Sequence, residues 1–350
     1  MRGLRKYISP FAPDQSGAAA VLYNLGGIIV IVDAGGCAGN VCGFDEPRWA
    51  FEKSIIFSAG LRDMDAILGR DDKLVAKLTD AAKKVEAKFV AVIGTPVPAV
   101  IATDYNAIRK MAEKKLEIPV LTIETTGMDL YDAGAEKAYV KMFETFAKDG
   151  FTAEKENIGV IGATPLDMSD LKAADKIEAA LKNGGFKNIY CYGMGAELSN
   201  VKAAGSVTKN LVVSPAGLKA AQYLKERFNT PYEVSYPLVY DILQDEAKEQ
   251  FKNFEGKKVL VIHQQVIANS IRDEIVRNVN SDITVASWFM LKDELKEAQD
   301  ISLKEEDQFV KLIEQGNYDV IVADNILKRA IPDFRGRYVN APHFAVSGKM

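Results

Sequence analysis

The chain has 350 residues, a formal net charge of −4 at pH 7, 48% hydrophobic residues and 26% charged residues. These proportions are typical of folded domains and exclude a disordered, collagen-like or coiled-coil chain. The balance of 44 basic against 48 acidic residues gives no positive field to gather nucleic acid. The N-terminal segment lacks the apolar run of a secretory signal, and no stretch reaches the ~18 apolar residues of a membrane span. We therefore expect a cytoplasmic protein without nucleic-acid or membrane partners.

Short, continuously apolar runs alternate with longer segments of helical periodicity along the whole chain. Such runs are typical of buried parallel strands joined by crossover helices. The predicted strands cover residues 28–32, 89–93, 120–123, 158–161, 188–192, 211–213, 259–262, 284–286 and 320–323. The predicted amphipathic helices cover residues 71–86, 104–115, 135–147, 169–183, 216–228, 265–279 and 305–315. The pattern predicts an α/β protein throughout.

Two polar segments divide these strand and helix groups into three. The segment DGFTAEKEN precedes the strand predicted from residue 158, and DEAKEQFKNFEGKK precedes the strand predicted from residue 259. A chain of this length has room for two or three domains. We therefore expect three α/β domains, at residues 1–150, 151–255 and 256–350.

The segment at residues 26–49, GGIIVIVDAGGCAGNVCGFDEPRW, carries the strongest functional signal. An apolar strand ends at Asp33, and the turn after it contains Gly35, Gly36, Cys37, Gly39, Cys42 and Gly43. Ligands of open parallel sheets bind outside the carboxyl ends of the strands, so function is expected here. Glycines let the backbone approach a bulky group closely, and loop N–H groups donate to phosphate or to thiolate and sulfide. Both kinds of ligand fit this loop.

Three readings of Cys37 and Cys42 follow from their C-x4-C spacing: inert thiols, metal ligands, or a redox pair. Two thiolates do not complete the usual four-cysteine shell of an iron–sulfur cluster. A second copy of the chain across a two-fold axis would supply the other two. The third cysteine, Cys191, lies in the apolar segment NIYCYGMG, where core packing is favoured over ligation.

Other motifs exclude several kinds of chemistry. The glycine turn lacks the GK[ST] ending of a phosphate-binding loop, and the GMG at 193–195 lacks a third glycine, so we expect no ATP bound by this chain. There is no HExxH or GxSxG motif. His263 follows a predicted strand and is a ligand candidate, which we rank above His343.

Several segments together resemble the nitrogenase component 1 superfamily. That family opens with a Cys-x-P-type segment and a Gly-Ala pair and reaches a His-Gly-Pro-x-Gly-Cys turn, which here resemble SPFAPDQSGAA and DAGGCAG. The segments IIFSAGLRDMDAILGRDDKL, NIGVIGATPLD, TKNLVVSPAG, GKKVLVIHQQ and NYDVIVADN are similar to later family segments in the same order. The resemblance covers almost the whole chain and implies three Rossmann-like domains, each a mostly parallel sheet flanked by helices.

The departures from the family pattern concern the cluster ligands. The first family cysteine would fall near Ser9, Pro10 or Phe11 and the third near Pro96, and no cysteine stands there. Only Cys37 matches a family ligand, and Cys42 would restore two cysteines per chain. The family cysteine that anchors the nitrogenase cofactor would fall close to Pro215, so an iron–molybdenum-type cofactor and dinitrogen reduction are not expected.

The resemblance implies an iron–sulfur oxidoreductase component. Gly36, Cys37 and Cys42 would form the cofactor loop of a [4Fe–4S] cluster shared by a homodimer, or by a heteromer with a homologous subunit. Electrons would arrive from an ATP-dependent iron–sulfur reductase, and a small molecule or tetrapyrrole-like substrate would bind between the domains. Candidate cleft residues are Thr95, Asp104, Thr164, Met194, Ser214 and His263. The alternatives are a non-catalytic scaffold for a metallocluster or cofactor, and a plain small-molecule binder.

Overall fold

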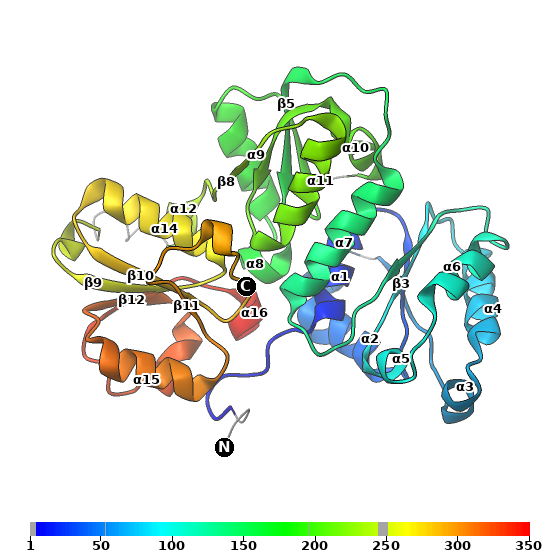
Figure 1. Ribbon diagram of the computed structural model, residues 1–350, viewed down its shortest axis with the longest axis horizontal. Helices are drawn as coiled ribbons and strands as arrows, with labels where there is room; N and C mark the ends of the chain where they lie inside the picture. The colour runs from blue at the N-terminus through cyan, green and yellow to red at the C-terminus, as the bar shows by residue number, and fades with distance from the viewer. Residues whose placement is uncertain (1–4, 53, 196, 244–250) are drawn as a thin grey trace.

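Three parallel sheets form three lobes of the molecule. The computed structural model describes residues 5–52, 54–195, 197–243 and 251–350. The strand orders are β2-β1-β3-β4, β6-β5-β7-β8 and β11-β10-β9-β12-β13, and every pairing within these sheets is parallel. Figure 1 shows the first sheet on the right, the second at the top and the third on the left. The α/β prediction is confirmed.

The first sheet has helices on both faces. Its strands are β1 (Ile28–Ile31), β2 (Ile55–Ser58), β3 (Val90–Ile93) and β4 (Val120–Ile123). Its helices are α1 (Asp14–Leu22), α2 (Gly36–Asn40), α3 (Asp63–Leu68), α4 (Asp71–Ala82), α5 (Pro96–Val100), α6 (Tyr105–Glu113) and α7 (Tyr131–Phe146). Ile28 and Val30 pack towards α4 and α6, whereas Ile29 and Ile31 pack towards α1 and α7. Since both faces are covered, the strand is apolar throughout.

The second sheet shares helix α7 with the first. Its strands are β5 (Glu154–Ile161), β6 (Asn188–Tyr192), β7 (Val207–Val212) and β8 (Tyr232–Val234). Its helices are α8 (Pro165–Met168), α9 (Ala173–Asn183), α10 (Leu198–Lys202), α11 (Leu218–Phe228) and α12 (Val239–Ile242). Tyr139, Met142 and Phe143 of α7 belong to one core with Ile161 and Val212. This shared core joins the first two lobes.

The third sheet joins the second through another shared core. Its strands are β9 (Lys258–Ile262), β10 (Asp282–Ser287), β11 (Ile301–Ser302), β12 (Val320–Ala323) and β13 (Arg337–Asn340), and its helices are α14 (Gln265–Asn278), α15 (Glu306–Gly316) and α16 (Phe344–Ser347). Val259 and Val261 pack with α14, while Leu260 and Ile262 pack with α15. The short turns are η1 (Val41–Asp45), η2 (Pro47–Ala50), η3 (Ala204–Ser206), η4 (Pro215–Gly217), η5 (Phe251–Phe254), η6 (Asp293–Leu295) and η7 (Asn325–Ala330).

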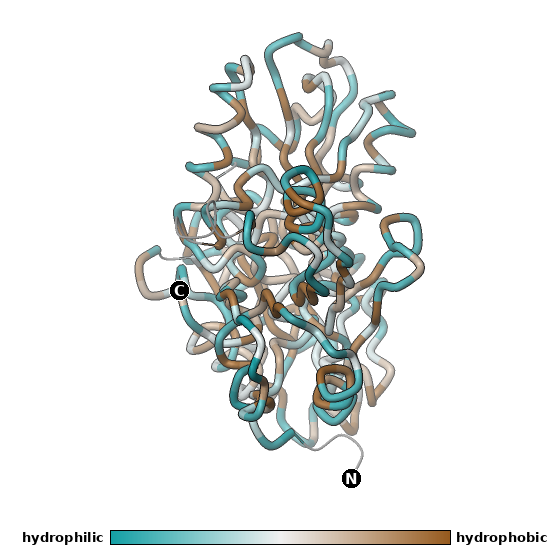
Figure 2. Tube along the Cα trace, turned by 90° about the vertical axis from the view of Figure 1, so that its left-hand side faces the viewer, coloured by the Kyte–Doolittle hydropathy of each residue, from teal (hydrophilic) through white to brown (hydrophobic). Residues whose placement is uncertain are grey.

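The predicted strands and helices occur, with shifts of a few residues at their ends. Strands β2, β8, β11 and β13 were not predicted, and neither were helix α1 and the short helices α2, α3, α5, α8, α10, α12 and α16. Helix α1 is buried along its whole length, so its sequence DQSGAAAVL has no polar face to mark it. In Figure 2 the apolar segments run mainly through the interior, and the outermost turns are mostly polar. Each sheet lies within one predicted domain range, and the exact boundaries remain a prediction.

Among the residues that the structure describes, no helix combines the length and the hydrophobicity needed to cross a bilayer.

Helices α1 and α7 pack against each other with their backbones in contact. A Cβ atom at Gly17 would lie 1.7 Å from the carbonyl oxygen of Tyr131, and one at Gly134 would lie 1.7 Å from that of Asp14. The Asp14 carboxylate accepts the backbone N–H groups of Thr126 and Gly127 at 2.8 and 2.7 Å. Only glycine permits this approach, so the helix pair is fixed by its two glycines.

We expect Gly17→Ala to lower the free energy of unfolding by about 3 kcal/mol or more, because the methyl group would overlap a backbone carbonyl that cannot rotate away. Urea unfolding measures the loss. Gly39→Ala is the control, because a Cβ there meets nothing within 4 Å. A Gly17→Ala protein as stable as the control would contradict the close helix contact.

Candidate functional site

The two cysteines of the glycine-rich loop lie on consecutive helical turns after β1. Cys37 is in α2, and Cys42 is in the π-helical turn η1, which follows without a break. Both thiols are half-buried and free. The buried Asp33 carboxylate accepts the Ala38 N–H at 2.7 Å and the Ser58 hydroxyl at 2.5 Å. Asp33 therefore fixes the start of the cysteine-bearing turn.

A buried ion pair ties this loop to the rest of the molecule. Glu46 and Arg48 are paired at 2.7 Å, with side chains 1% and 4% exposed. Arg48 also donates to the carbonyls of Ala20 in α1 and Gly193 after β6, at 2.7 and 2.9 Å. The Asp45 carboxylate accepts the Ser16 hydroxyl at 2.6 Å. The loop is thus held against helix α1 and the second sheet at once.

Burial favours the protonated form of both thiols. Burial raises the pKa of Cys37, the Asp33 charge adds to it, and a hydrogen bond with Thr95 opposes it. Burial, followed by the charge of Glu46, raises the pKa of Cys42. Because a metal binds thiolate rather than thiol, metal binding at this loop would release protons.

The loop has the donors and the space for half of a cluster shell. A Cβ at Gly35, Gly36, Gly39 or Gly43 would meet nothing within 4 Å, so the outer side of the loop is open. Within the described part of this one chain, no group of three histidine, cysteine or acidic side chains lies close enough to hold a metal ion. The described residues of one chain therefore supply two thiols to this loop and no third ligand beside them.

The structure does not bring the predicted cleft residues together in one place. Thr95 lies beside Cys37 and donates to the Val32 carbonyl at 2.7 Å. Asp104 is exposed and caps helix α6 by accepting the Ala107 N–H at 2.9 Å, away from the others. The remaining candidates are buried in the second and third lobes, and they are Thr164, Met194, Ser214 and His263.

A buried polar cluster joins all three lobes. The Tyr131 hydroxyl, at the start of α7, hydrogen-bonds the Asp167 carboxyl of α8 and lies 3.0 Å from Nε2 of His343. The His343 ring stacks on that of His263 at 4.2 Å between centroids. Ser214 lies close enough to lower the pKa of Asp167. We call Tyr131, Asp167, His263 and His343 the junction cluster.

Three members of the junction cluster, Asp167, Tyr131 and His343, form a hydrogen-bonded chain that allows two proton arrangements. His263 accepts the Gln264 N–H at Nδ1, which leaves its Nε2–H to donate to the Pro342 carbonyl at 3.1 Å. In the other ring, Nδ1 of His343 is buried without a partner in the described structure. Either Tyr131 donates to Asp167 and accepts from His343, or a protonated Asp167 donates to Tyr131, which donates to His343. The second arrangement holds one proton more than the first, because Asp167 is protonated and His343 carries its proton at Nδ1 instead of Nε2.

Burial shifts the pKa values of this cluster towards the neutral forms. It raises the pKa of Asp167 to about 6 and lowers the pKa values of His263 and His343 to about 3. Nearby, burial also raises the pKa of Asp132 to about 6. Burial therefore favours the neutral forms of the Asp167 carboxyl and of both imidazoles.

Sequence reasoning missed most of this cluster. Asp167 lies just after the turn that ends β5, and its place at a strand's carboxyl end was the available signal. Tyr131 carries no such signal. His343 was ranked below His263, yet the structure stacks the two rings. Cys191 is buried in β6, as core packing requires.

The sequence match to a protein family agrees with the three parallel sheets and the cysteine loop. The family model for nitrogenase component 1 type oxidoreductases matches residues 15–244, and the chain belongs to that family. A stretch of 107 residues is 30% identical to the nitrogenase iron-molybdenum cofactor biosynthesis protein NifE of Clostridium pasteurianum. This stretch covers 30% of the present chain and 24% of that protein, so only about a quarter of the relative's length is matched.

Two solved structures share the fold. A structure titled nitrogenase Cp1 at pH 6.5 has a TM-score of 0.71 at 10% identity, covering 97% of this chain and 87% of its own. A structure titled nitrogenase Cp1 at pH 5 has a TM-score of 0.69 at 16% identity, covering 97% and 84%. At these identities the likeness concerns the fold.

The junction cluster predicts a specific pH dependence of stability. The lowered pKa values of His263 and His343 mean that stability is lost as the pH falls from about 6.5 towards 3. The raised pKa of Asp167 acts oppositely, adding stability at low pH that disappears as the pH rises towards 6. Between pH 6 and pH 4, we expect the free energy of unfolding to fall by about 2 kcal/mol more in Asp167→Asn than in the unmodified protein.

Chemical unfolding at several pH values between 4 and 7 measures this difference. Asp170→Asn is the control, because the pKa of Asp170 is lowered through its contact with Lys176. In Asp170→Asn, the free energy of unfolding should fall less steeply with decreasing pH than in the unmodified protein. If Asp167→Asn keeps the slope of the unmodified protein, the Asp167 carboxyl is ionised throughout this range.

Proposed function

We propose that this chain is an iron–sulfur component of a nitrogenase-like oxidoreductase, with one [4Fe–4S] cluster held between two copies by Cys37 and Cys42 of each. The observation that carries the proposal is the pair of half-buried thiols at the open, glycine-rich end of the first sheet. Electrons would come from a separate ATP-dependent iron–sulfur reductase and pass to a small or tetrapyrrole-like molecule. The cluster would supply one-electron transfer.

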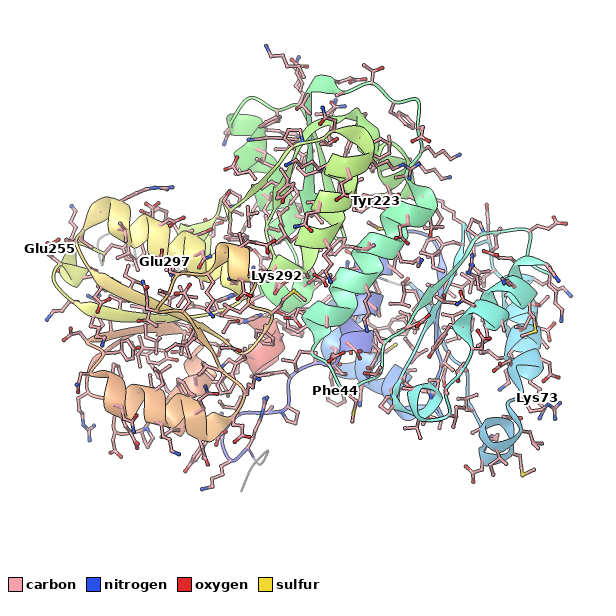
Figure 3. All side chains as sticks on the ribbon, in the orientation of Figure 1. Phe44, Lys73, Tyr223, Glu255, Lys292 and Glu297 are labelled. Atoms are coloured by element: carbon pink, nitrogen blue, oxygen red, sulfur yellow. The ribbon has the colours of Figure 1, made fainter. Side chains whose placement is uncertain are left out.

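The apolar end of the first sheet supports pairing with a second chain. Exposed large apolar side chains follow the carboxyl ends of all four of its strands, and we call them the apolar rim: Phe44, Met64, Ile67, Leu68, Val97, Val100, Ile101 and Met128. In Figure 1, helices α2, α3 and α5 lie together at the lower end of this sheet, and Figure 3 places Phe44 there. Exposed apolar surface gathered around a site marks an interface.

A two-fold arrangement of this rim accounts for both the surface and the ligand count. The same patch on two copies is self-complementary in an isologous dimer. The copies would bring two cysteines each to the axis, which completes a four-thiolate shell. A homologous subunit with a similar loop would do the same in a heteromer.

Each residue of the loop has a defined part in this proposal. Cys37 and Cys42 are the ligands, and their thiols must lose protons that burial now holds on them. Asp33 and Arg48 position the loop through buried hydrogen bonds. Gly36 leaves the outer face of the turn open to a bulky inorganic group.

A scaffold or carrier of a metallocluster is the second candidate. The cleft candidates Thr164, Ser214 and His263 are each at most 2% exposed, so a substrate would reach them only if the lobes separated. The relative with a matching segment is named for cofactor biosynthesis. A scaffold would keep its cluster without turnover when an electron donor is supplied, whereas an oxidoreductase would consume electrons.

Iron and sulfide analysis of anaerobically purified protein tests the shared cluster. We expect about two irons and two sulfides per chain in a dimer, because a [4Fe–4S] group is divided between two chains. Cys42→Ser should lose nearly all the iron, since a serine hydroxyl replaces a thiolate ligand. Cys191→Ala is the control and should keep its iron, because Cys191 is buried in the second sheet.

Two outcomes would count against the shared cluster. Full iron content in Cys42→Ser would remove Cys42 from the ligands. Metal-free protein after reconstitution would leave the family fold without this redox site.

The apolar rim makes a separate prediction about assembly. Val100→Asp should weaken the dimer at least tenfold, because a carboxylate would be desolvated in the contact, and Val100 is 84% exposed in the single chain. Analytical ultracentrifugation measures the dissociation constant. The matched control is Val276→Asp in α14, where the valine is 57% exposed on the third lobe.

Equal masses for both aspartate variants and the unmodified protein at every concentration would exclude the rim as the interface. Loss of dimer only in Val276→Asp would place the interface on the third lobe instead.

A further inference from the structure

A cavity of about 540 Å³ opens between the second and third lobes, separate from the cysteine loop and from the predicted cleft residues. Its walls come from the segments that follow β5, β8, β12 and β13 and from the last residues of the chain. Figure 1 marks the C-terminus at this boundary, beside α16. The volume suits a medium-sized organic molecule.

The cavity lies where parallel sheets bind ligands. In the second sheet, the chain leaves β5 for β6 on one side, and β7 lies on the other. In the third sheet, β9 and β12 are neighbours, with β10 and β13 beyond them. Ligands of open α/β sheets bind at the carboxyl ends of strands beside such a reversal. Here the segments after β5 and after β12 face the same cavity from two lobes.

Most acidic groups of the cavity wall are already paired. The Lys176 ammonium contacts the carboxylates of Asp170 and Asp241 at 2.9 and 3.6 Å. The buried Asp324 carboxylate accepts the backbone N–H groups of Ile326 and His343 at 2.8 and 2.9 Å. These acceptors are therefore already occupied by donors of the protein itself.

The charged groups left over are cations. Arg329 and Lys349 line the cavity, and neither has an acidic partner among the residues that the structure describes. The Asn340 side chain uses its oxygen to accept the Asn325 N–H at 3.0 Å, which leaves its amide N–H groups for another acceptor. Two cations and an amide donor, with no free acid opposite them, match an anion.

Much of the remaining wall is apolar. Met168, Tyr236, Leu238 and Ile326 line the cavity with their hydrocarbon or aromatic surface. A ligand made only of charge would leave this surface in contact with water. An apolar body that carries one anionic group would satisfy both parts of the wall.

We propose that this cavity binds an organic anion with an apolar or aromatic body and a carboxylate or phosphate head group, which Arg329, Lys349 and Asn340 hold. The proposal is independent of the cysteines and of the iron–sulfur cluster. It assigns the second and third lobes a small-molecule site of their own.

Isothermal titration of the full chain with three naphthalene probes tests the site. The probes are 1-naphthyl phosphate, 1-naphthoate and neutral 1-naphthol, which share the apolar body and differ in the head group. We expect at least one anion to bind at least tenfold more tightly than 1-naphthol. Arg329→Gln should weaken that anion at least tenfold and leave 1-naphthol unchanged. The tighter of the two anions identifies the head group as phosphate or carboxylate.

Arg335→Gln is the matched control, because Arg335 is 83% exposed on the same lobe and is absent from the cavity wall. It should bind all three probes as the unmodified protein does. Equal anion affinity in Arg329→Gln and the unmodified protein would overturn the proposal. So would the absence of binding by either anion at millimolar concentration. Since Arg329 is exposed, its substitution leaves the core intact.

Discussion

The backbone contact between α1 and α7 sets the position of both functional regions. Gly17 and Gly134 let the two helices touch, and each helix then serves a different region. Helix α1 supplies Ser16 and the Ala20 carbonyl, which hold Asp45 and Arg48 of the cysteine loop. Helix α7 begins at Tyr131, the central group of the junction cluster. A shift of one helix along the other would therefore displace the cysteines and the buried proton chain together.

All three sheets are parallel, but the loops at the carboxyl ends of their strands form two different kinds of surface. Each places its connecting loops at the carboxyl ends of parallel strands, where ligands are expected. At the first sheet these loops expose apolar side chains around two thiols, which suits another protein chain more than a dissolved metabolite. At the second and third sheets they line a cavity with Arg329 and Lys349, which have no acidic partner in the described part of the chain. In our proposals, one architecture thus serves a protein partner on one lobe and a small molecule on the other two.

The sequence predicted what local pattern encodes and missed what only folding brings together. Apolar runs such as residues 259–262 predicted buried strands, and the Gly-Cys turn at 35–43 drew attention directly. Helix α1 was missed because burial on all sides removes its periodicity. The junction cluster was missed because Tyr131 lies 36 residues from Asp167 and 212 from His343. Arg48 likewise meets Gly193 across 145 residues, and no spacing in the sequence announces such a contact.

Proton release and chain pairing are linked in the proposed cluster site. In the single chain, burial and neighbouring carboxylates raise the pKa values of Cys37 and Cys42, so a metal ion would have to displace a proton from each thiol. In the single chain, the exposure of the apolar rim to water is also unfavourable. A second copy would cover the rim and add two ligands, and the metal charge would then stabilise all four thiolates. Because each event favours the other, metal affinity should depend on protein concentration and dimer affinity on metal, by the reciprocity of linked equilibria.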